Sequence, residues 1–317
     1  MSFIDNIQIG WQWIAAFLQT NQAWPPLLFA ILVLMIDIVR RRSVRWSDQA
    51  IRSVITNLSL KVSNGYLRHF VIFATIWAQG AYNNFGIPRL SPQIWSDVPV
   101  WLLVPGVVLA MDFADYWNHR LMHTRWLWPI HSIHHSDPCV TVLTTSRVHF
   151  LEPLVMRLSY VILLGWMGLP AGVLGGAGVL LVLHNMYVHI NVDWGHGPLR
   201  HIIASPRFHR WHHANTPEAF DKNLANFFPF YDVLFGTYYV PGTCHADVGC
   251  DHSPVNNVLQ MIFWPATEWM RLGAVALSKH PQEGCRGTPV RQACIGRLLR
   301  VSTSRTMEAV VRRSFYA

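Results

Sequence analysis

Five long apolar segments constrain the fold of this chain more than any other feature. They cover residues 23–39, 70–81, 98–117, 154–169 and 171–190. About 20 apolar residues can cross a bilayer as a helix, and shorter apolar segments can insert in pairs. Hydrophobic residues make up 51% of the chain and charged residues only 13%, which excludes a disordered chain or a disulfide scaffold. We therefore predict an all-α, polytopic membrane helical bundle of about four to five spanning or hairpin helices.

Basic residues indicate how these helices are oriented. Arg40, Arg41 and Arg42 follow the first apolar segment, and Arg89 is the only Lys or Arg clearly within an outer loop. Because cytoplasmic loops collect positive charge, residues 40–69, 118–153 and 191–317 are predicted to lie inside. The net charge of +8 then reflects membrane orientation, and no nucleic acid partner is expected. We expect an integral, multi-pass protein with its site on the cytoplasmic face. The absence of a terminal retrieval motif favours a bacterial inner membrane. If the chain is eukaryotic, we expect it in the endoplasmic reticulum.

Two further patterns concern helix packing and the end of the chain. Gly168, Gly172 and Gly176 are spaced four apart, which predicts close helix contact in the hairpin of residues 154–190. Residues 258–277 are apolar but interrupted by charge, which favours a helix lying in the membrane interface, followed by a loose basic tail.

Histidines are as numerous as all acidic residues together, 17 of each, and 13 of them lie between His119 and His213. They form three clusters: His119-x-x-x-His123, His131-x-x-His134-His135 and His209-x-x-His212-His213. Side chains three or four residues apart are neighbours on a helix and can share one metal, whereas an adjacent histidine can turn toward another ion. Eight imidazoles exceed the need of one tetrahedral zinc, so two metals are expected. Imidazole suits iron, zinc and copper alike.

The order of these clusters resembles the fatty acid hydroxylase / sterol desaturase superfamily of membrane di-iron enzymes. The similar elements are residues 115–120, His189-Ile-Asn191, residues 205–213, Asp221-Lys-Asn223 and residues 235–238. The resemblance implies three regions: N-terminal membrane helices at 1–94, a fatty acid hydroxylase-like catalytic region at 95–240, whose histidines cap the cytosolic face, and an interfacial helix with a basic tail at 241–317.

The resemblance also implies which residues hold the metals. The implied ligands are His119, His123, His131, His134, His135, His189, His209, His212 and His213. Asp115, four residues before His119, would accept the second ring N–H of a ligand histidine. Whether His149 and His184 also bind metal stays open, since Phe150 stands where the family has proline after His149.

The implied reaction is O2-dependent hydroxylation or desaturation of a membrane lipid C–H bond, with two iron ions as cofactors and O2 as co-substrate. We detect no flavin, nicotinamide or ferredoxin pattern, so the external electron donor is expected to be a separate reductase or electron-transfer protein. No residue selects the lipid. A dizinc membrane hydrolase and a non-catalytic metal- or haem-binding membrane protein remain as alternatives. A zinc clip of Cys244, His245, Cys250 and His252 is disfavoured.

Overall fold

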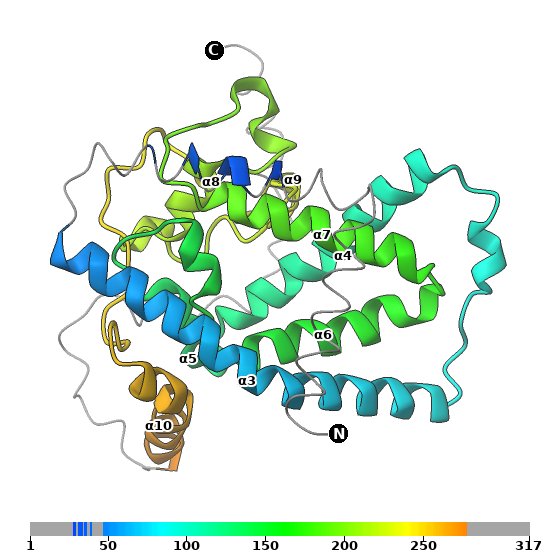
Figure 1. Ribbon diagram of the computed structural model, residues 1–317, viewed down its shortest axis with the longest axis horizontal. Helices are drawn as coiled ribbons and strands as arrows, with labels where there is room; N and C mark the ends of the chain where they lie inside the picture. The colour runs from blue at the N-terminus through cyan, green and yellow to red at the C-terminus, as the bar shows by residue number, and fades with distance from the viewer. Residues whose placement is uncertain (1–27, 30, 34, 37–38, 40–46, 278–317) are drawn as a thin grey trace, which may run out of the picture. The chain divides into compact units, whose positions relative to one another are not determined.

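The computed structural model describes residues 28–29, 31–33, 35–36, 39 and 47–277, and helices dominate this part of the chain (Figure 1). The described residues contain no β-strand, only an isolated antiparallel bridge between Ala214 and Val248. The all-α prediction is therefore confirmed. The apolar segment at 23–39 falls partly, and the basic tail wholly, outside the described residues.

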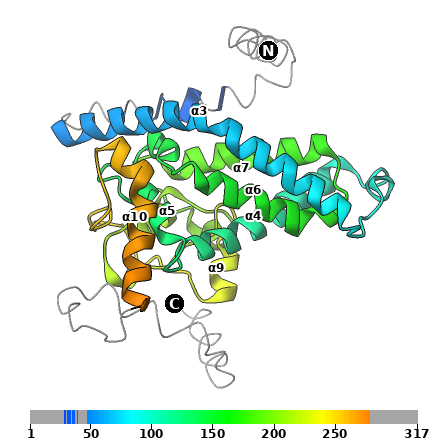
Figure 2. The same ribbon diagram turned by 90° about the horizontal axis from the view of Figure 1, so that it is seen from below.

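Four long helices form the body of the bundle. They are α3 (Asp48–Asn84), α4 (Val100–Met122), α6 (Leu151–Leu164) and α7 (Ala171–Val188). Helix α6 packs against α3 and α4, and α4 packs against α7, so the helices follow one another as α3, α6, α4 and α7 (Figures 1 and 2). Val107 and Met111 of α4 are buried with Ala177 and Leu181 of α7, which excludes water from this contact.

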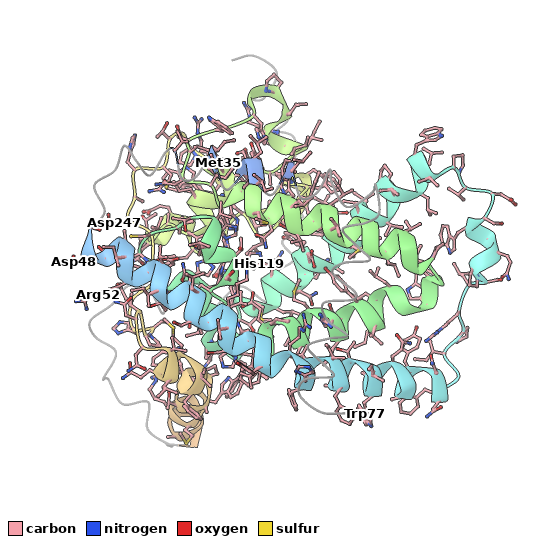
Figure 3. All side chains as sticks on the ribbon, in the orientation of Figure 1. Met35, Asp48, Arg52, Trp77, His119 and Asp247 are labelled. Atoms are coloured by element: carbon pink, nitrogen blue, oxygen red, sulfur yellow. The ribbon has the colours of Figure 1, made fainter. Side chains whose placement is uncertain are left out.

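Helix α3 differs from the sequence prediction. The sequence predicts a short apolar segment at residues 70–81 that follows the inner residues 40–69, but α3 is one helix of 37 residues. It begins at the N-cap Ser47, whose side chain accepts the Ala50 N–H. The polar side chains of Ser53, Thr56 and Asn57 in its first half are buried. Trp77 in its second half is 70% exposed and points away from the bundle (Figure 3). Polar burial explains why the hydropathy pattern missed this first half.

Six short elements lie between α4 and α6 or after α7 in the chain. They are α5 (Trp128–His135), η2 (Val142–Ser146), η4 (Gly197–His201), α8 (Pro206–His212), η5 (Pro217–Ala219) and α9 (Phe230–Phe235). Of the two remaining 3₁₀ turns, η1 (Pro92–Trp95) precedes α4 and η3 (Gly165–Met167) follows α6. Helix α10 (Val258–Leu277) packs against α5 and α3, and its limits agree with the predicted helix.

Gly168 has a different role from the one its spacing suggested. It has φ +61°, and a Cβ there would collide with the carbonyl oxygen of Leu90. The turn between α6 and α7 therefore requires glycine. A Cβ on Gly172 or Gly176 would meet no atom of the described residues within 4 Å, so the described part of the chain does not contain the predicted close contact through these two residues.

One described helix, α4, is long and apolar enough to cross a membrane by length and composition. A shorter apolar helix covers Gly172–Val188. The predicted number of spanning helices, and the division at residues 94 and 240, stay predictions.

Candidate metal centre

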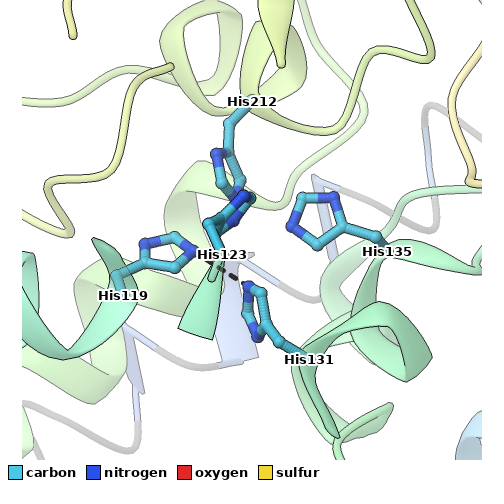
Figure 4. A group of neighbouring side chains, drawn as sticks. All are labelled: His119, His123, His131, His135 and His212. Atoms are coloured by element: carbon cyan, nitrogen blue, oxygen red, sulfur yellow. Dashed lines mark hydrogen bonds between the residues drawn. The ribbon is translucent and has the colours of Figure 1, made fainter. Parts of the chain in front are cut away.

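All nine histidines that we expected to bind metal come together in two groups. Group A consists of His119, His123, His131, His135 and His212, and group B consists of His134, His189, His209 and His213. Within each group, one ring nitrogen of each residue lies within 4.8 Å of those of all the others. Figure 4 shows the rings of group A converging from α4, α5 and α8. Their role as ligands remains a prediction.

Each short helix contributes to both groups. On α5, His131 and His135 belong to group A and His134 to group B, whereas α8 contributes His209 and His213 to group B and His212 to group A. Residues i and i+4 share a helix face, but i+3 leaves the helix about 100° from i+4. Each helix thus places its i+3 imidazole in the group to which the other helix gives two. The two groups are in contact where His135 stacks on His213, with ring centroids 4.6 Å apart.

Group B is held together through Nε2 atoms. His189 Nε2 lies 3.3 Å from His134 Nε2 and 2.9 Å from His209 Nε2, and His213 Nε2 lies 3.1 Å from His209 Nε2. The four lone-pair positions therefore face a common point, which suits a single cation.

Group A presents the same nitrogen. His119 Nε2 lies 3.0 Å from His131 Nε2, and the Nε2 atoms of His123, His135 and His212 are buried without a hydrogen-bond partner among the described residues. An unpaired buried polar atom costs about 1–3 kcal/mol. A metal ion bound by these nitrogens would remove that cost, so the residues fit such an ion.

One loop, residues 221–225, orients three of the five histidines of group A. The Nδ1–H of His123 donates to the Asp221 carboxylate (3.2 Å), and that of His212 donates to the Lys222 carbonyl (2.9 Å). The Nδ1–H of His119 donates to the Leu224 carbonyl (2.7 Å). A proton held on Nδ1 leaves the Nε2 lone pair for a metal. The loop therefore sets both the orientation and the tautomer of these rings.

The loop itself is fixed by two polar side chains. Asn223, with φ +57°, donates to the carbonyls of Phe208 and Tyr239 and accepts the Tyr239 N–H. Buried Asp232 accepts the N–H groups of Leu224 and Ala225. Asn223 belongs to a motif that can be found in the sequence, whereas Asp232 has no characteristic spacing to the clusters and is not predicted from it.

The carboxylate beside His131 was also missed, and Asp115 was placed wrongly. His131 Nδ1–H donates to Glu152 Oε2 (3.1 Å), 21 residues further along the chain. Asp115 instead accepts the Tyr160 hydroxyl and interacts with the side chain of Asn226, and no described contact joins it to a histidine. Helix spacing alone placed Asp115 one turn from His119, but packing turns it toward α6.

Other candidate residues lie outside both groups. His149 Nε2–H donates to the Ile262 carbonyl, and its Nδ1 accepts the Leu151 N–H, so both ring nitrogens are occupied. His184 Nε2–H donates to the Ala204 carbonyl. The thiols of Cys244 and Cys250 donate to backbone carbonyls, and no metal-binding group found among the described residues contains them.

A buried polar network ties α5 to α3. Arg147 is fully buried and donates to the Ile133 carbonyl and to Asn57 Oδ1 (3.1 Å). Asn57 Nδ2 donates to Asp137 (2.9 Å), which also accepts the hydroxyl of Thr144. The network joins a buried cation to a buried anion through one amide and holds the end of the first His-x-x-His-His motif in place.

Burial keeps the histidines of α5 and α8 neutral. Desolvation first, and then repulsion from neighbouring imidazoles, lowers the pKa of all six well below the usual 6.5; they are His131, His134, His135, His209, His212 and His213. Neutral imidazole is the form that binds metal, so the centre is ready for ligation at neutral pH.

Comparisons with known proteins agree with this geometry. Residues 104–237, which include both groups, match the model of the fatty acid hydroxylase family. The ornithine lipid hydroxylase OlsE of Rhizobium tropici is 35% identical over 159 residues, which are 49% of this chain and 48% of that protein. The alkylglycerol monooxygenase of Homo sapiens is 27% identical over 192 residues, 60% of this chain and 41% of that protein.

A third relative, the very-long-chain aldehyde decarbonylase GL1-7 of Oryza sativa subsp. japonica, is 26% identical over 209 residues, 58% of this chain and 32% of that protein. The chain thus spans less than half the length of each of these relatives. No solved structure matches it. The histidine order, the two converging groups and the family match agree, and residues 104–237 are similar to the fatty acid hydroxylase family.

Proposed function

We propose that this chain is a membrane non-haem di-iron oxidoreductase that hydroxylates a lipid C–H bond with O2. The observation that supports this most strongly is the pair of adjacent groups of five and four imidazoles, seven of them from buried residues, with Nε2 atoms facing inward. A ligand set of neutral nitrogens, without thiolate, suits iron as well as zinc. The match to the fatty acid hydroxylase family favours iron.

Two irons would supply the reduction of O2 and the oxidation of the C–H bond. The overall reaction is RH + O2 + 2 e⁻ + 2 H⁺ → ROH + H2O, and the electrons come from a separate electron-transfer protein. The chain's own residues hold the site: nine imidazoles bind, and Glu152 and Asp221 accept Nδ1 protons so that the Nε2 lone pairs stay directed inward.

The proposed substrate is a membrane lipid. Two of the relatives are named for ornithine lipid and alkylglycerol, and they are called hydroxylase and monooxygenase, which favours hydroxylation over desaturation. The apolar helix α4 and the exposed Trp77 support a bundle inserted in the bilayer. We propose a multi-pass arrangement in a bacterial inner membrane, with the histidines on the cytoplasmic face.

Metal analysis of the protein purified in detergent tests this function. We expect about two irons per chain, a coupled diferric Mössbauer signal and no Soret band, together with O2-dependent formation of a hydroxylated lipid when a reductant is supplied. Two zinc ions that iron cannot displace, without O2 consumption, would favour the dizinc hydrolase. A Soret band would favour a haem protein.

A further inference from the structure

Outside the metal centre, a second polar hollow lies beside the start of α8. Its volume is ≈ 390 Å³, and its polar walls include Arg200, His201, Ser205, Arg207 and Tyr238. None of these side chains belongs to group A or group B. The hollow therefore has a composition that metal binding does not explain.

The hollow carries an uncompensated positive charge. The Arg207 guanidinium is paired with Asp193 through two hydrogen bonds of 2.7 and 2.9 Å, and Asp193 also accepts the Thr243 hydroxyl. Arg200 is exposed and donates to His201 Nε2 (3.3 Å), but it has no ion pair with any carboxylate of the described chain. Arg200 is thus available to bind an anion, and guanidinium is well suited to phosphate.

Three large, exposed apolar side chains lie next to residues of this cationic hollow in the chain. Trp194, Leu199 and Ile202 are 39%, 50% and 51% exposed. Trp194 adjoins the hollow because its carbonyl accepts the Arg207 N–H (3.1 Å), and the other two directly flank Arg200 and His201 in the chain. These exposed apolar side chains would add nothing to the binding free energy of a soluble anion. Tryptophan and basic residues together are typical of the level of lipid headgroups.

We propose that this hollow binds the phosphate of an anionic phospholipid headgroup, with the three apolar side chains inserted among the adjoining acyl chains. The proposal rests on the membrane location proposed above but not on the reaction. Ser205 lines the hollow and also caps α8 by accepting the Phe208 N–H (3.2 Å). A bound headgroup would therefore hold the histidine-bearing helix α8 next to the membrane surface.

Lipid retention by the full-length protein in detergent tests the proposal by native mass spectrometry. The probes are phosphatidylglycerol and phosphatidylcholine with identical acyl chains. We expect preferential retention of phosphatidylglycerol and about tenfold weaker binding in Arg200→Gln, which corresponds to about 1.4 kcal/mol. Arg125→Gln is the matched control, because Arg125 is exposed but lies over the Trp126 ring, 5.5 Å from its centroid. It should retain the lipid normally.

Equal losses in the two arginine variants, or equal retention of both lipids by the wild type, would overturn the proposal. Inorganic phosphate that displaces phosphatidylglycerol at equal concentration would identify a soluble anion as the ligand and would also overturn it. Tyr238→Phe supplies a second variant that keeps the ring contacts with His201 and Phe208. It should weaken retention less than Arg200→Gln does. A protein that stays in the membrane without retaining lipid refutes only this inference, whereas one that stays outside the membrane refutes the location.

Discussion

Glu152→Ala is the sharpest test of how the protein holds group A. The substitution removes the carboxylate that lies 3.1 Å from His131 Nδ1, and the side chains of His131 and Glu152 are only 5% and 16% exposed. Water therefore replaces the lost acceptor poorly. Loss of such a partner weakens metal binding about 10- to 100-fold, and burial places this case near 100-fold, or about 2.7 kcal/mol.

The assay is chelator competition on detergent-purified protein loaded with Co²⁺, whose absorption reports each ion separately. One ion should be lost at lower chelator concentration in Glu152→Ala, while the ion of group B is retained as in the wild type. Glu152→Gln keeps an acceptor oxygen and should retain most of the affinity, and Glu218→Ala, at an exposed residue, should change nothing. Equal behaviour of the Ala and Gln variants, or equal loss of both ions, would refute the reasoning.

Three further predictions concern the centre and its support. His134→Ala and His135→Ala should each leave about one ion per chain, with different Co²⁺ spectra because the adjacent rings belong to different groups. His134→Ala should also abolish activity without preventing membrane insertion. Identical Co²⁺ spectra of the two variants, or normal turnover by His134→Ala, would contradict this. Arg147→Met should lower the free energy of unfolding by about 3–5 kcal/mol, because buried Asp137 loses its nearby cation and the buried oxygens of Ile133 and Asn57 lose their donor. Thermal denaturation measures this, and a loss below about 1 kcal/mol would disagree. The metal-free protein should lose stability as the pH falls below about 6.5, by up to about 1.4 kcal/mol per histidine and pH unit, because the unfolded chain takes up protons that the α5 and α8 imidazoles, with their lowered pKa, cannot. A melting temperature that is constant from pH 5 to 8 would rule this out.

Local spacing was sufficient to find the metal-binding candidates. The pairs His119/His123 and His131/His135 lie one turn apart, and a helix brings such residues to one face whatever surrounds it. Helix spacing did not predict the partner of Asp115, since a position on a helix face does not say which neighbouring helix that face contacts. The hydropathy pattern also did not predict the first half of α3, whose polar side chains Ser53 and Asn57 are buried against Asp137.

The sequence by itself determined the helical class and the three histidine clusters as candidate ligands, because these depend on hydropathy and on the 3.6-residue period. Tertiary structure alone decided which cluster members share a group. His134 joins His189 and His209 because α5 and α8 face each other and exchange their i+3 side chains. It also decided which carboxylates touch the histidines, since Glu152 and Asp221 reach His131 and His123 from elements distant in sequence. Such contacts depend on how helices and loops pack, which no local period encodes.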